Sequence, residues 1–115
     1  MEFALYHYWR SSASWRLRWA LELKKIKPTR MVHVGLLNGD SESPEHTARN
    51  PMGFVPVLEV RENQASEPRL LIESLPIIEW LDETIPKPSF FTGDAFSRQH
   101  IRSLCEIVNA GIQPL

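Results

Sequence analysis

The chain has 115 residues, with 13 basic and 14 acidic side chains that leave a formal net charge of −1 at pH 7. This length suffices for one domain with a single core and leaves no room for a second complete one. The balanced charge and the scattered arginines exclude a strongly basic nucleic-acid-binding surface, so we expect a small ligand.

The apolar runs and the single cysteine restrict the cellular location of the protein and the thiol or metal chemistry that it can perform. No apolar run approaches the ~20 residues that span a bilayer, and the N-terminus lacks the basic start of a signal peptide, which predicts a cytoplasmic protein. Cys105 is the only cysteine, which excludes an internal disulfide and a Cys-x-x-Cys redox centre. The four histidines show no metal-ligand spacing, so we expect no metal, and thiol chemistry would need a thiol from outside.

The first third of the chain predicts a strand, a helix and a strand. Phe3 to His7 is short, apolar and aromatic, which is typical of a strand buried on both faces. Apolar residues at helical spacing follow from Ser12 to Lys24, and Pro28 ends that pattern. Arg30 to Val34 alternates enough to predict a second strand. This order predicts a right-handed parallel crossover.

A short helix and a hairpin are expected next. Ser43 as N-cap and Pro44 at the first helical position predict a helix to about Arg49. The segments Val57 to Val60 and Leu70 to Ile72 predict two hairpin strands joined by a long polar loop.

Ser74 is predicted to cap a third helix that runs through Glu83, with Leu75, Ile78 and Leu81 as its buried stripe. The complete order is then βαβαββα. This order predicts an α/β layer structure, with helices on both faces of a small mixed sheet.

The last part of the chain changes character. Residues 86–93 begin with the stiff segment Pro86-Lys87-Pro88-Ser89 and are predicted to be a linker. Residues 94–115 predict an amphipathic helix, the first of a second, helical unit within which the sequence stops. Its apolar stripe needs cover from self-association or from the remainder of a longer protein, and it consists of Ile101, Leu104, Cys105, Val108 and Ile112.

A run of serines opens the first helix directly after the first strand. Free N–H groups at a helix start and the hydroxyls of Ser11, Ser12 and Ser14 together suit an anion. Ligands of open α/β sheets lie beyond the carboxyl ends of the strands, where this run is expected. Serines at such places are more often plain caps, worth about 1 kcal/mol, so the run alone does not establish a site.

Two further junctions share the predicted edge of the sheet. Val55-Pro56 is either an ordinary strand-start proline or a cis bond that turns the Val55 N–H and C=O toward a peptide-like ligand. Glu73-Ser74 is either a simple N-cap or a helix N-terminus beside a carboxylate, able to hold an α-amino-acid group. Together with the serine run, these junctions predict a site for a small acidic peptide.

Four segments resemble, in order and spacing, the zeta class of glutathione transferases, which includes maleylacetoacetate isomerase. They are Tyr8–Arg18 (YWRSSASWRLR), Asn50–Leu58 (NPMGFVPVL), Glu73–Leu81 (ESLPIIEWL) and Ala110–Leu115 (AGIQPL). The resemblance implies a thioredoxin-like, glutathione-binding domain with a mixed four-stranded sheet over residues 1–85, followed by the start of an all-helical domain.

The resemblance also implies residue roles. The Ser11 hydroxyl would hydrogen-bond to the glutathione sulfur, with Ser12 and Arg16 beside it as catalytic residues. The implied glutathione-binding residues are Ser11, Val55, Pro56, Glu73, Ser74 and Gln113. From their chemistry, the arginines near the first helix are either surface charges or partners for a substrate with two carboxylates, for which Arg10 and Arg16 are the candidates. One departure concerns Ala13, which stands where the class usually has a cysteine, so any role of that cysteine is absent. Ser41, near a glutamine of relatives that contacts glutathione, is left out of the predicted site.

The activity that the resemblance implies is glutathione-dependent cis–trans isomerisation of maleylacetoacetate to fumarylacetoacetate, in aromatic amino acid catabolism, with glutathione transfer to small electrophiles such as α-halo acids. Bound thiolate would add to the cis double bond, and its expulsion after rotation would leave the trans product and unchanged glutathione. A homodimer is implied as well. Ala13 and the missing helical domain favour an alternative, a glutathione-binding module without catalysis. A glutaredoxin-like oxidoreductase is disfavoured because the first helix lacks a cysteine.

Overall fold

The structure, a computed structural model, describes residues 1–35 and 38–112, with only the backbone at positions 111 and 112. The chain divides into two compact units, Met1–Ile78 and Glu79–Leu115, and the boundary falls inside helix α3 (Ser74–Thr84). We describe each unit by itself. The domain limits expected at residues 85 and 94 stay a prediction.

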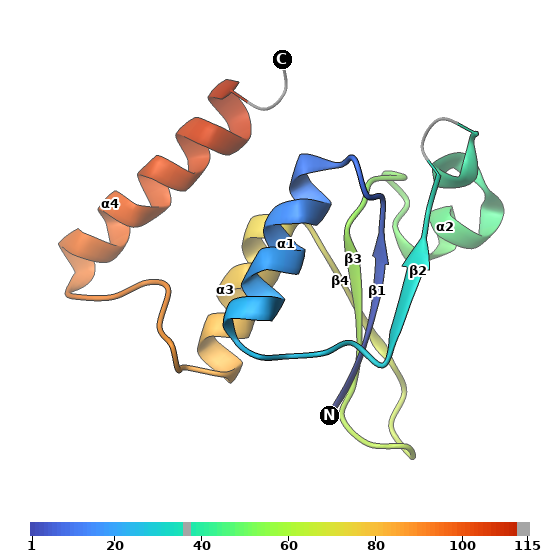
Figure 1. The fold of residues 1–115 in the computed structure, drawn as a ribbon, viewed down its shortest axis with the longest axis horizontal. Coiled ribbons are helices and arrows are strands. Elements are labelled where there is room, and N and C mark those ends of the chain that lie inside the picture. Colours follow the sequence, from blue (N-terminus) through green and yellow to red (C-terminus); the bar gives the residue numbers. More distant parts are fainter. Residues whose placement is uncertain (36–37, 113–115) are drawn as a thin grey trace. The chain divides into compact units, whose positions relative to one another are not determined.

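The first unit is built on a four-stranded mixed sheet in the order β2-β1-β3-β4 (Figure 1). Its strands are β1 (Glu2–His7), β2 (Arg30–His33), β3 (Val57–Arg61) and β4 (Arg69–Ile72). Strand β1 pairs with β2 in parallel, whereas β3 runs antiparallel to both β1 and β4. The predicted parallel crossover, hairpin and mixed sheet are therefore confirmed.

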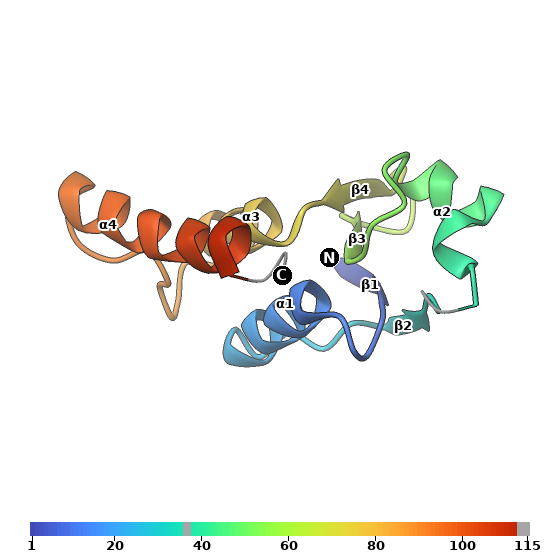
Figure 2. The same ribbon diagram turned by 90° about the horizontal axis from the view of Figure 1, so that it is seen from above.

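Helices lie on both faces of this sheet. Helix α1 (Ser12–Leu23) lies on one face and α2 (Pro44–Arg49) on the other, as the view from above makes clear (Figure 2). The N-cap of α2 is Ser43, whose side chain accepts from the His46 N–H, and Pro44 occupies the first turn. A short 3-10 helix, η1 (Asp40–Glu42), precedes α2 and was not predicted.

The hydrophobic core of the first unit lies on both faces of the sheet, around strand β1. Phe3 to Tyr6 are all buried, as expected for a strand covered on both sides. Leu5 stands opposite Leu58, and both are fully buried, as is Leu17 of α1. Each such leucine contributes about 1.5–3 kcal/mol through burial of its side chain. On the other face, a second cluster forms around Tyr6 and Val57.

The predicted buried stripe of α3 is partly wrong. Leu81 is fully buried as expected, but Leu75 and Ile78 are only half-buried, and the fully buried partner of Leu81 is Ile77. Because Ile77 and Leu81 are four residues apart, they share one face of the helix. The unbroken apolar run from Leu75 to Ile78 gave no unique phase, so only packing could select the buried face.

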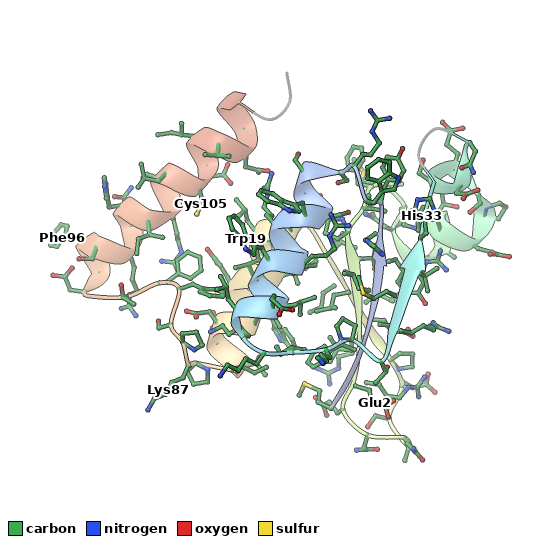
Figure 3. All side chains as sticks on the ribbon, viewed as in Figure 1. Glu2, Trp19, His33, Lys87, Phe96 and Cys105 are labelled. Atoms are coloured by element: carbon green, nitrogen blue, oxygen red, sulfur yellow. The ribbon has the colours of Figure 1, made fainter. Side chains whose placement is uncertain are left out.

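The second unit contains the end of α3 and helix α4 (Ala95–Glu106), which Asp94 caps by accepting from the Ser97 N–H. Regular helix ends at Glu106, and a π-helical segment, η2 (Ile107–Ile112), follows instead of the predicted continuous helix. Phe96 is 86% exposed and points away from the helix (Figure 3). Within this unit, Arg102 Nε donates to Glu79 Oε1 at 2.9 Å. Every helix in the described residues is too short or too polar to cross a bilayer.

Candidate glutathione site

Strand direction and register bring the three predicted junctions to one edge of the sheet. Strands β1 and β4 run the same way and β3 runs opposite, so the ends of β1 and β4 and the start of β3 share that edge. Tyr6, Val57 and Ile72 stand opposite one another in a row across the three strands. Residues 8–14, 55–56 and 73–74 therefore emerge beside each other from strands that are distant in sequence.

The turn after β1 is held by three hydrogen bonds among Tyr8, Ser11 and Ser14. The Ser11 N–H donates to the Tyr8 carbonyl at 3.0 Å, the Ser14 N–H to Ser11 Oγ at 3.1 Å, and the Tyr8 N–H to Ser14 Oγ at 3.3 Å. Ser14 is fully buried, whereas Ser11 is half-buried. Since Ser11 Oγ acts as an acceptor in the cap, its own proton remains available for donation to a ligand.

Helix α1 adds backbone donors beside that hydroxyl. Its first intrahelical bond runs from the Trp15 N–H to the Ser11 carbonyl at 2.9 Å. The N–H groups of Ser12 and Ala13 precede this bond, and neither has a hydrogen-bond partner in the described residues. Ser12 is exposed and Ala13 half-buried. An anion at this position would meet two free N–H groups and the positive end of the helix dipole.

Arg16 connects the serine turn with the start of α3. It is half-buried on α1, and its Nη1 donates to Ser74 Oγ at 3.2 Å. Ser74 is 5% exposed and is the first residue of α3, so it does not occupy the predicted N-cap position. The structure thus brings Arg16 and Ser74 into contact, which the sequence did not predict, at the sheet edge that was expected to hold both the serine run and Ser74.

Glu73 takes the position that was predicted for Ser74. Its carbonyl accepts from the Ile77 N–H at 3.0 Å, the first helical bond, so Glu73 directly precedes the helix. It adopts a left-handed backbone conformation, with φ of 71°, which is uncommon for a residue other than glycine. The side chain is exposed beside the helix N-terminus. A carboxylate and helical N–H groups are therefore offered side by side, as an α-amino-acid group requires.

The bond between Val55 and Pro56 is cis, an isomer that the sequence alone left open. Both residues are buried, with Val55 at 8% exposure. Among residues 1–35 and 38–112, we find no hydrogen-bond partner for the N–H or C=O of Val55. Backbone polar groups in such a position require a partner, and an extended peptide ligand can supply one.

Arg10, in the turn after β1, and Arg18, on α1, both contact Trp9. Arg10 is exposed and its guanidinium stacks over the Trp9 ring at 5.5 Å. Arg18 Nη1 lies 2.9 Å from His7 Nδ1, and Arg18 Nη2 donates to the Trp9 carbonyl at 3.1 Å. Partial burial, and then the charges of Arg18 and His33, lower the pKa of His7. The sequence did not predict these two contacts of Arg18, because they join a helix to a strand and to a turn and leave no local pattern.

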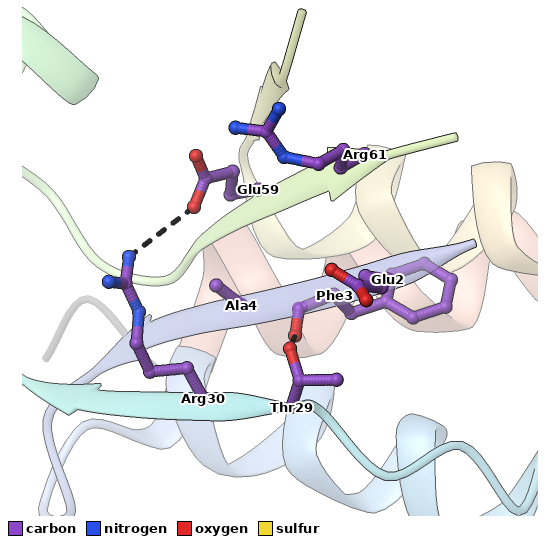
Figure 4. Close-up of a pocket in the computed structure, with 7 residues that line it drawn as sticks. All are labelled: Glu2, Phe3, Ala4, Thr29, Arg30, Glu59 and Arg61. Atoms are coloured by element: carbon purple, nitrogen blue, oxygen red, sulfur yellow. Dashed lines mark hydrogen bonds and ion pairs between the residues drawn. The ribbon is translucent and has the colours of Figure 1, made fainter. Parts of the chain in front are cut away.

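One predicted site residue lies outside the described part of the chain, and a separate cavity lies away from this edge. Gln113 lies outside the described residues. No group of three His, Cys, Asp or Glu side chains in the described part of the chain is arranged to hold a metal ion. A cavity of about 320 Å³ lies at the opposite edge of the sheet, where Arg30 forms an ion pair with Glu59 at 3.5 Å (Figure 4). It includes none of the predicted site residues.

Comparison with known proteins defines the family. The model of the glutathione S-transferase N-terminal domain matches residues 10–84. The chain is 42% identical to maleylacetoacetate isomerase of Rhizobium meliloti (strain 1021), a match that covers 99% of this chain and 50% of that protein. The chain therefore belongs to the glutathione S-transferase family.

Solved structures support the same assignment and narrow it. A crystal structure of maleylacetoacetate isomerase from Anaeromyxobacter dehalogenans 2CP-1 with bound GSH has a TM-score of 0.83 at 43% identity, covering 98% of this chain and 51% of that one. The holo structure of maleyl pyruvate isomerase, a bacterial zeta-class enzyme, has a TM-score of 0.83 at 38% identity, covering 96% and 49%. The resemblance to the zeta class and the thioredoxin-like fold are thereby confirmed. The chain spans about half the length of these relatives.

Proposed function

We propose that this chain binds glutathione as a thiolate and supplies half of the active site of a glutathione-dependent cis–trans isomerase. The observation that carries the proposal is the shared sheet edge. Along it lie the Ser11 hydroxyl, the Arg16–Ser74 contact and the Val55 backbone, whose N–H and C=O have no partner among the described residues. These groups match a tripeptide with a thiol in its centre and an α-amino-acid group at one end. The glutathione-bound relative supports this ligand.

The residues at the start of α1 would favour ionisation of the bound thiol. A free thiol has a pKa of about 8.5 and is mostly protonated at neutral pH. The Ser11 hydroxyl donates to sulfur, while the helix N-terminus and the Arg16 charge stabilise a nearby anion. Each unit by which the thiol pKa falls corresponds to about 1.4 kcal/mol. A fall of about two units would make most of the bound glutathione nucleophilic at pH 7.

The rest of the ligand would be bound along the same edge. Val55 offers its N–H and C=O to the cysteinyl backbone, as in the addition of a strand. Glu73 offers a carboxylate to the γ-glutamyl ammonium, and the N-terminus of α3 with Ser74 favours the γ-glutamyl carboxylate. Pro56 completes the turn that presents Val55, and Gln113 is assigned to this site only by the resemblance.

The proposed second substrate is a small cis-configured organic acid of the maleylacetoacetate type. The names of the relatives, maleylacetoacetate isomerase and maleyl pyruvate isomerase, support this class. Glutathione supplies a nucleophilic sulfur for reversible addition to the double bond and emerges unchanged. Arg10 and Arg16 are the candidates to hold the acid's carboxylate. Transfer of glutathione to α-halo acids, a role in aromatic amino acid catabolism, a cytoplasmic location and a homodimer belong to the same proposal.

A titration of the purified protein with glutathione tests the first part. We expect saturable binding by calorimetry, together with thiolate absorbance of the bound ligand at neutral pH. S-methylglutathione is the matched control, since it keeps the peptide but cannot ionise at sulfur. Absence of glutathione binding would overturn the proposal.

An activity assay tests the second part. We expect glutathione-dependent conversion of maleylacetoacetate or maleylpyruvate to the trans isomer. Binding of glutathione without turnover would favour the non-catalytic module. The replacement of the class's usual cysteine by Ala13 is the observation that keeps this alternative in view.

A further inference from the structure

The carbonyl of Phe54, directly before Val55, accepts two hydrogen bonds from the end of α2. His46 Nε2 lies 2.9 Å from the Phe54 oxygen, and Asn50 Nδ2 donates to the same oxygen at 3.1 Å. The side chains of His46 and Asn50 are buried, at 0% and 1% exposure. Since a carbonyl only accepts, His46 Nε2 carries a proton and donates it to Phe54. The buried Nδ1 of His46 has no partner in the described residues.

Asn50 also holds the loop that leads to Val55. Its Oδ1 accepts from the Met52 N–H at 3.0 Å, and its carbonyl accepts from the Gly53 N–H at 2.8 Å. Gly53 turns the chain with φ of 77°, a conformation that glycine adopts without cost. Met52, Gly53 and Phe54 are thus each hydrogen-bonded to Asn50, the residue that caps the end of α2, and Val55 follows them.

Because the peptide bond is planar, the hydrogen bonds to the Phe54 carbonyl also fix the orientation of the Val55 N–H. The Phe54 carbonyl and the Val55 N–H belong to one planar trans peptide group, in which they point in opposite directions. Two donors that fix the direction of the carbonyl therefore also fix the direction of the N–H. The Val55 N–H has no partner within the described chain.

We propose that His46 and Asn50 are positioning residues that aim the Val55 N–H at the peptide backbone of the bound ligand. The proposal rests on the proposed function, in which that ligand is glutathione. Neither side chain contacts the ligand; both act through the Phe54 peptide group. The buried histidine is thereby explained, because a purely apolar residue would fill the space but leave the carbonyl with a single donor.

The proposal predicts that loss of the His46 donor lowers affinity but leaves stability unchanged. Loss of the His46 donor leaves the peptide group freer to rotate, and a weakened ligand hydrogen bond of ordinary strength lowers affinity about threefold to tenfold. Replacement of His46 by phenylalanine also removes the unpartnered Nδ1 from the interior, which offsets the lost hydrogen bond in the folded protein. A merely structural residue would lower both quantities together.

The test compares His46→Phe, His46→Gln and the matched control His100→Phe, which makes the same change at an exposed histidine of α4. We expect His46→Phe to raise the Kd and KM for glutathione about threefold to tenfold, with kcat at saturating glutathione unchanged. The pKa of the bound thiol and the free energy of unfolding should stay at the parent values. His46→Gln keeps an N–H donor and should restore the affinity to within about twofold of the parent.

Several outcomes decide against the proposal. Parental glutathione affinity in a folded His46→Phe variant would overturn it, as would equal losses of affinity and stability in both His46 variants. Should His46→Phe not fold, Asn50→Asp, which keeps Oδ1 and loses the Nδ2 donor, must show the same rise in Kd with an unchanged thiol pKa. A parent protein that does not bind glutathione at all would instead overturn the proposed function itself.

Discussion

Arg16 on α1 donates from Nη1 to the hydroxyl of Ser74 at the start of α3, across 3.2 Å. This contact links helices α1 and α3 near their N-termini, and its two residues are 58 positions apart in sequence. One N-terminus is proposed to receive the sulfur of glutathione and the other its γ-glutamyl carboxylate. Arg16 therefore adds a positive charge between two proposed anion positions.

Arg16→Lys separates the charge of this residue from its geometry. The variant keeps the charge but loses the planar guanidinium that reaches Ser74, so we expect glutathione affinity to fall about fivefold. Arg16→Gln loses the charge too and should additionally raise the pKa of the bound thiol. Calorimetry and a pH titration of thiolate absorbance measure the two effects. Equal thiol pKa values in the two variants would show that the Arg16 charge does not act on sulfur.

Ser11→Ala should remove the proposed donor to sulfur. We expect turnover to fall about tenfold to a hundredfold, because a hydrogen bond to an anion is lost, with little change in glutathione affinity. The free energy of unfolding should also fall by about 1 kcal/mol, since Ser11 caps α1. Ser11→Thr keeps the hydroxyl and is the control for both readouts. Parental turnover in Ser11→Ala would remove Ser11 from the mechanism.

Substitutions of Glu73 should change glutathione affinity and stability in different ways. Its φ of 71° is adopted more easily by glycine, so Glu73→Gly should raise the free energy of unfolding by about 1 kcal/mol and weaken glutathione binding. Glu73→Gln keeps the backbone constraint and removes the charge, so it should lose affinity at unchanged stability. Chemical denaturation and calorimetry measure both quantities. A Glu73→Gln variant that binds like the parent would argue against an ammonium contact at this position.

His7 predicts a pH dependence of stability near neutrality. Its folded-state pKa lies below the ordinary value of 6.5, because burial and the charges of Arg18 and His33 oppose protonation. The unfolded chain therefore binds more protons in this range, and the free energy of unfolding should decrease as pH falls through 6.5 toward the folded-state pKa. His7→Gln should flatten this decrease, whereas the same change at exposed His100 should not. Denaturation at a series of pH values provides the measurement.

Features specified by neighbouring residues could be predicted from the sequence. The cap at Ser43 and the proline at Pro44 predicted the start of α2 to the residue, because both act on the helix turn that they begin. Short apolar or alternating segments between loops also predicted all four strands, with their ends within one or two residues. The family assignment depended on motifs rather than on such patterns, and the comparisons confirmed it.

Contacts between distant segments could not be predicted in this way. The burial of Ile77 depends on which side of α3 meets the core, and a continuous apolar run does not specify that side. The left-handed conformation of Glu73 carries no signal in residue type, since glycine or asparagine would be expected there. The hydrogen bond between His46 and the Phe54 carbonyl likewise depends on the path of the loop between these two residues.

The row formed by Tyr6, Val57 and Ile72 makes the proposed site dependent on strand register. A shift of β3 by one residue would move Val55 about 3.3 Å along the strand axis relative to its neighbours and reverse the direction of its N–H and C=O. Only a chain in which three distant strands have paired correctly can bind the tripeptide along its whole length. Glutathione would then act as a folding ligand, which raises the unfolding temperature with its concentration and distinguishes native pairing from a compact but misregistered chain.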